Sequence, residues 1–89
     1  MNGSLEFDLT TDEGQMNQLK CLMIQSHPTF ACPVTKKLLD YRTTEIVKFQ
    51  DKGKTKTDII STEGIQILKD KGMIDKLGLV IVQNPDEVG

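Results

Sequence analysis

The sequence has few of the residues that build metal centres, disulfide frameworks and membrane spans. It contains two cysteines, Cys21 and Cys32, a single histidine, His27, and no tryptophan among 89 residues. Two cysteines are too few for the disulfide framework of a small secreted domain, and a usual structural zinc site would lack a fourth ligand. The longest apolar run, Leu79 to Val82, is far shorter than the roughly 20 residues that a membrane span needs. We therefore expect no metal, no cofactor and no contact with a membrane.

The length of the chain limits its organisation. A chain of 89 residues can build one modest core but not two, so we expect a single domain over residues 1–89. The N-terminal residues lack the basic and then apolar pattern of a secretory signal, which predicts a cytoplasmic protein. Residues 1–8 and 84–89 are expected to be flexible.

Two helices are predicted in the N-terminal half. Thr10 and Glu13 have the spacing of a capping box, and an apolar stripe at helical spacing follows them as far as Ser26. A second, short helix is predicted from Cys32 to Tyr41, because Pro33 suits the first position of a helix and Cys32 would act as its cap.

Strand patterns begin at Thr43. Residues 45–50 alternate apolar and polar side chains, residues 51–54 supply a turn with Gly53, and residues 55–60 form the returning strand of a β-hairpin. The tip of this hairpin is polar and basic.

A third helix and a last strand complete the predicted fold. Ser61 is a typical N-cap, and Gly72 is a typical left-handed stop, so the helix between them has a signal at each end. The β-branched run from Leu79 to Gln83 predicts a central strand that is covered on both faces. The fold class is therefore predicted to be α+β, with two N-terminal helices, a hairpin, a third helix and a final strand.

Positive charge is concentrated in the middle of the chain. The formal net charge is -2, from 11 basic and 13 acidic residues. Residues 36–56 nevertheless hold seven basic and three acidic side chains, a local charge of +4. Such asymmetry can mark a surface for an anionic partner. The predicted binding residues are Lys36, Lys37, Arg42, Lys48, Lys52, Lys54 and Lys56.

Residues 44–72 resemble the wing and following helix of winged-helix transcription regulators. The resemblance rests on a basic hairpin, residues 45–60, that leads directly into the helix starting at Ser61-Thr62-Glu63-Gly64. It implies that Lys52, Lys54 and Lys56 contact the phosphate backbone. It also implies that the segment with Lys36, Lys37 and Arg42 lies in the major groove.

A second pattern resembles the start of the active-site helix in glutaredoxins. The sequence Cys32-Pro33-Val34-Thr35 is followed by Lys36. A thiol at a helix N-terminus beside a lysine is stabilised as a thiolate, so this resemblance implies a single-cysteine redox protein that uses Cys32.

Two classes of function therefore stay open. The first is a small non-catalytic binding or regulatory module that docks on a larger protein or nucleic-acid assembly, and it is the function that we predict. The alternative is the redox protein. A three-stranded sheet with little covering mass also leaves an edge, which favours a homodimer.

Overall fold

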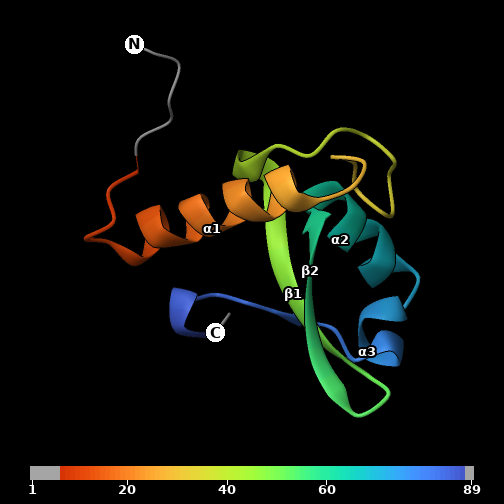
Figure 1. Cartoon of the computed structure of the whole chain (residues 1–89). Helices are drawn as coiled ribbons and strands as arrows, with labels where there is room; N and C mark the ends of the chain where they lie inside the picture. Colours follow the sequence, from red (N-terminus) through yellow and green to blue (C-terminus); the bar gives the residue numbers. More distant parts are fainter. Residues whose placement is uncertain (1–6, 88–89) are drawn as a thin grey trace.

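The computed structural model, which describes residues 7–87, combines helices with a three-stranded antiparallel sheet (Figure 1). The α+β class is thus confirmed. In chain order the elements are α1 (Asp12–Ser26), the 3-10 helix η1 (Tyr41–Thr43), β1 (Thr44–Asp51), β2 (Lys54–Ser61), α2 (Thr62–Asp70), α3 (Met73–Leu77), β3 (Val80–Ile81) and the 3-10 helix η2 (Pro85–Glu87).

The first helix forms as predicted, but its cap is one residue later. The Thr11 hydroxyl accepts a hydrogen bond from the Gly14 amide at 3.0 Å, so Thr11 and not Thr10 is the N-cap. Thr10 donates its own hydroxyl to the Asp8 carboxylate and is therefore occupied in the preceding turn. The helix ends at Ser26.

The predicted helix from Cys32 to Tyr41 is wrong. The chain forms a tight loop there, in which the Cys32 amide donates to the Lys37 carbonyl at 2.9 Å. A bridge between Ala31 and Leu38 closes the loop. Lys36 has a positive φ of 66°, a conformation that a right-handed helix excludes. The capping pattern at Cys32 and Pro33 is therefore followed by a single turn, which does not continue into a helix.

The hairpin is confirmed, with the turn at Lys52 and Gly53. Asp51 pairs with Lys54, and the two residues between them have φ angles of 53° and 80°. Positive φ at both central residues is typical of a type I′ turn, whose twist matches that of paired strands.

The third helix is also confirmed. The Ser61 hydroxyl accepts the Gly64 amide at 3.0 Å, and Gly72 is left-handed with a φ of 69°. The sequence did not predict the short α3 that follows, which ends at a second left-handed glycine, Gly78 (φ 67°).

The last strand is shorter than predicted and lies at the edge of the sheet. The strand order is β2-β1-β3, so β1 is central. β3 pairs only with Val47 and Lys48 of β1, and Val80 is 59% exposed. The prediction of a central strand covered on both faces is therefore wrong for residues 79–83. That description fits β1, in which the neighbouring residues Ile46 and Val47 are both fully buried.

The sheet separates two small cores. The helix α1 covers one face, where the buried residues are Met16, Ile46, Ile59 and Val82. The helices α2 and α3 and the loop at Cys32 cover the other face, where the buried residues are Cys32, Val47, Ile60 and Ile65. In Figure 1 the far end of the hairpin extends past α1 and α2.

The predictions for the chain ends fall partly outside the described residues, which exclude 1–6 and 88–89. Near the C-terminal end, η2 is closed by a hydrogen bond of 3.1 Å from the Gln83 amide to the Glu87 carboxylate. No helix within residues 7–87 is long and apolar enough to cross a membrane.

Replacing Gly72 by valine is expected to lower the free energy of unfolding by about 1 kcal/mol or more, because a β-branched residue resists the left-handed conformation. Urea denaturation followed by circular dichroism measures the loss. Lys71→Val is the matched control, since Lys71 is also exposed but has a φ of -91°. The control should cost at most about 0.5 kcal/mol. Equal losses in the two variants would contradict the role assigned to Gly72.

Candidate functional site

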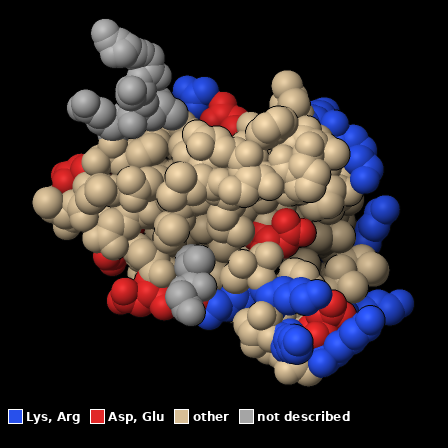
Figure 2. Space-filling model, in the orientation of Figure 1, with Lys and Arg blue, Asp and Glu red and all other residues tan. Residues whose placement is uncertain are grey.

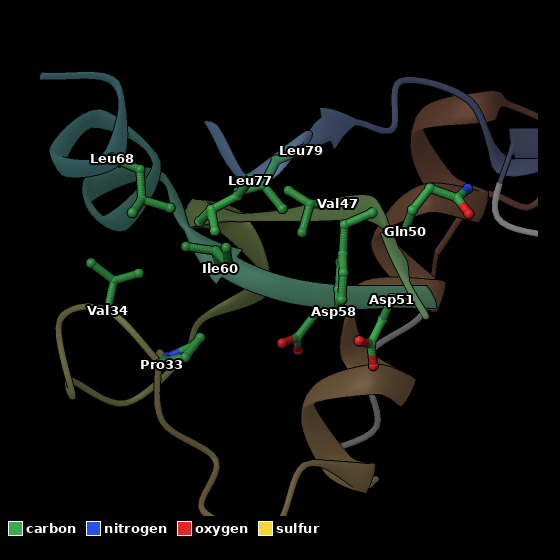
Figure 3. A pocket seen from close by; sticks show the side chains of 11 residues that line it. Pro33, Val34, Val47, Gln50, Asp51, Asp58, Ile60, Leu68, Leu77 and Leu79 are labelled. Atoms are coloured by element: carbon green, nitrogen blue, oxygen red, sulfur yellow. The ribbon is translucent and has the colours of Figure 1, made fainter. Parts of the chain in front are cut away.

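An open groove of about 310 Å³ lies on the face of the sheet that α2 and α3 cover (Figure 3). Val47 and Phe49 of β1 and Ile60 of β2 contribute to its lining. In Figure 3, Leu77 and Leu79 lie on one side of the groove and Pro33 and Val34 on the other, with Ile60 between them. Leu68 of α2 also lines it, so the groove is bounded mainly by aliphatic side chains from five separate parts of the chain.

The groove is open because the covering helices are short. Val47 and Phe49 share a sheet face, since they are two residues apart in a strand. Val47 lies under α2 and α3 and is fully buried, whereas Phe49 is nearer the hairpin tip and only half-buried. The helix α3 has five residues and ends at Leu77, whose side chain is 48% exposed. Apolar surface is thus left uncovered next to the core.

Two carboxylates lie at the rim of the groove. The Asp51 carboxylate accepts a hydrogen bond from the Lys56 ammonium at 2.8 Å. The Asp58 carboxylate accepts the backbone amide of Ile59 at 2.7 Å. In Figure 3 both carboxylates point away from the leucines, so the interior of the groove stays apolar and the charges lie at its edge.

Three of the seven predicted binding residues are held in ion pairs. Besides Lys56, Lys37 pairs with Glu63 at 3.1 Å and Arg42 with Asp40 at 2.8 Å. Hydrogen bonds from the Arg42 side chain and backbone lower the pKa of Asp40 to about 2. Such exposed pairs add little stability, but they occupy the basic groups.

The other four are Lys36, Lys48, Lys52 and Lys54, which form no ion pair with any residue between 7 and 87. Lys52 and Lys54 are exposed at the hairpin tip, where Figure 2 shows basic side chains gathered. Lys36 is exposed on the loop after Cys32.

The lysines of the hairpin do not share one face. Directly opposed residues of an antiparallel pair point to the same side, and Lys56 opposes Phe49 in the register. Lys54 and Lys56 therefore point to the face with the groove. Lys48 opposes Thr57 and points to the α1 face, where it is half-buried beside Val80. The structure brings Lys52, Lys54 and Lys56 together and separates Lys48 from them.

The Cys32 thiol is buried, with 1% of the residue exposed. Its sulfur accepts hydrogen bonds from the amides of Val34, Thr35 and Ser61 and from the Ser61 hydroxyl, at 3.3 to 3.5 Å. The segment after Cys32 is a turn and not a helix, so the thiol does not cap a helix of its own. It lies instead against the start of α2, at the N-cap Ser61. In this conformation the sulfur is screened from solvent.

These contacts also set the acidity of the thiol. Burial alone would raise the pKa of Cys32, but the four donors outweigh it and lower the pKa to about 7. Burial raises the pKa of the other thiol, Cys21.

Within the part of the chain that the structure describes, no three His, Cys, Asp or Glu side chains come together as a metal site. Comparison with known proteins returned no match among family models, curated proteins or solved structures.

The groove was not predicted from the sequence. Leu68 and Leu79 belong to the predicted third helix and last strand, but α3 and its Leu77 were missed. A signal was available, because Gly78 directly follows Leu77 and glycine commonly ends a helix. No local sequence pattern indicated that Pro33 and Val34 lie across the groove from Leu77 and Leu79.

We expect the free energy of unfolding to rise by up to about 2 kcal/mol between pH 7 and pH 9. The native pKa of Cys32 is about 7 against 9.0 for a free thiol, so the unfolded state binds more protons in this window. Urea denaturation in the presence of a phosphine reductant measures the rise. The rise in the free energy of unfolding should be absent in the Cys32→Ser variant and present in the Cys21→Ser variant. A flat profile in the unmodified protein would contradict the hydrogen-bonded thiolate.

Proposed function

We propose that this chain is a non-catalytic module that binds an apolar segment of a protein partner in the groove beside α3. The observation that carries the proposal is the groove itself, an uncovered aliphatic surface with charges confined to its edge. Exposed apolar surface rimmed by polar groups is typical of interaction sites. The volume of about 310 Å³ suits one or two large side chains.

The charges beside the groove indicate the chemistry of the partner. Lys54 points to the groove face and forms no ion pair within residues 7–87, and Lys52 is exposed next to it. Asp51 is already neutralised by Lys56. A segment with a leucine, methionine or phenylalanine next to Asp or Glu would match both the apolar lining and the two lysines.

Nucleic acid is the second candidate partner, because Lys52 and Lys54 could also contact phosphates. The winged-helix resemblance remains a prediction. Its reading helix would have to contain Lys36, Lys37 and Arg42. In the structure Lys36 and Lys37 lie in a loop, and Arg42 lies in the 3-10 helix η1.

Selection from a displayed library of random peptides tests the proposal without knowledge of the natural partner. Enriched peptides should carry a large apolar residue beside an acidic one. Synthetic copies should bind the Leu77→Gln variant about tenfold more weakly, because a partly exposed leucine in the groove contributes on the order of 1 kcal/mol. Titration calorimetry gives the dissociation constants.

Leu22→Gln is the matched control. Leu22 is 51% exposed, close to the 48% of Leu77, but it lies on α1. The control should bind the peptides as the unmodified chain does. Peptides that bind both leucine variants equally would contradict the groove as the site. Tight binding of mixed-sequence DNA or RNA that survives Leu77→Gln but is lost in Lys52→Glu/Lys54→Glu would favour the second candidate.

A further inference from the structure

The strand β2 has an open outer edge. It is the first strand in the order β2-β1-β3, so only one of its edges is paired. Thr55, Lys56 and Thr57 are exposed, and no described helix or loop covers this part of the strand. An edge of this kind presents backbone amides and carbonyls to any chain that can pair with it.

Two hydrogen bonds show which amides point outward. The Ser61 amide donates to the Cys32 sulfur at 3.5 Å and the Ile59 amide to the Asp58 carboxylate at 2.7 Å, so neither donates to β1. Amides alternate in direction along a strand. The amides of Thr55 and Thr57 therefore also point away from β1.

We propose that two copies of this chain form a dimer by antiparallel pairing of β2 with β2, on a two-fold axis at Thr57. In this arrangement Thr57 opposes Thr57 of the second copy, and Thr55 opposes Ile59. Lys56 of each copy then lies directly opposite Asp58 of the other. The two subunits form one continuous six-stranded sheet. The proposal does not depend on what binds in the groove.

The charges select this register. Residues whose amides point outward can pair only with residues of the second copy whose amides also point outward. The two-fold axis must therefore pass through a residue and not between two residues. An axis at Lys56 would place two lysines opposite each other, and an axis at Asp58 would place two aspartates opposite each other. Like charges that are directly opposed destabilise a strand pair. The axis at Thr57 instead forms two symmetric lysine–aspartate pairs.

The single chain already holds Asp58 in a suitable position. Its carboxylate caps the outward Ile59 amide and is half-buried at the rim of β2 (Figure 3). In the dimer, the carbonyl of Thr55 in the second copy accepts that amide, and the Asp58 carboxylate is free to pair with Lys56 of the second copy. Lys56 then exchanges its exposed ion pair with Asp51 for the pair with Asp58. The paired segment ends before Ser61, because the Ser61 amide is taken by the Cys32 sulfur.

Sedimentation equilibrium over a range of concentrations tests the dimer. The unmodified chain should approach twice the monomer mass as its concentration rises. Thr57→Pro should stay monomeric, because it removes an outward donor while leaving the pairing with β1 intact. A monomer at every concentration, or a dimer that persists in folded Thr57→Pro, would overturn the proposal.

Charge reversal tests the register separately. Lys56→Asp and Asp58→Lys should each weaken the dimer about tenfold or more, since each replaces two attractive pairs by repulsive ones. The double variant Lys56→Asp/Asp58→Lys restores opposite charges and should dimerise within about threefold of the unmodified chain. Lys52→Asp is the control, because Lys52 lies in the turn outside the paired segment. A double variant as weak as the single ones would overturn the axis at Thr57.

Discussion

The structure depends on the double burial of β1. Ile46 and Val47 are adjacent in this strand, so their side chains point to opposite faces, and both have 0% exposure. Each face therefore needs its own cover, which α1 provides for Ile46 and which α2, α3 and the Cys32 loop provide for Val47. A chain of 89 residues has little apolar surface beyond these two cores to stabilise its fold.

The helix α3, which covers part of one sheet face, has fewer residues than the strands beneath it. β1 and β2 each have eight residues, whereas α3 has five. The base of the hairpin is enclosed, and the half nearer the tip extends beyond the layers on both faces. The groove arises from this difference in length, because the short α3 leaves apolar surface of the sheet uncovered. The open edge of β2 has another cause, since β3 pairs with the opposite edge of β1.

Cys32 connects the loop to the start of α2. Its sulfur accepts both the amide and the hydroxyl of Ser61, and the same hydroxyl caps α2 by accepting the Gly64 amide. Gly64 fits closely here, since a Cβ at this position would lie 3.0 Å from the sulfur. The lowered pKa of this thiol thus accompanies a structural contact at the junction of β2 and α2.

The sequence by itself determined the elements whose signals are local. The Lys52-Gly53 turn and the helix between Ser61 and Gly72 were predictable, because their defining hydrogen bonds and dihedral angles involve residues close in the chain. Tertiary structure decided the rest. The segment after Cys32 has the pattern of a helix start, yet long-range packing against Ser61 and Gly64 holds it as a loop. The β-branched run at residues 79–83 could not reveal its place in the sheet, because that place depends on which strand edge is free and not on the run itself.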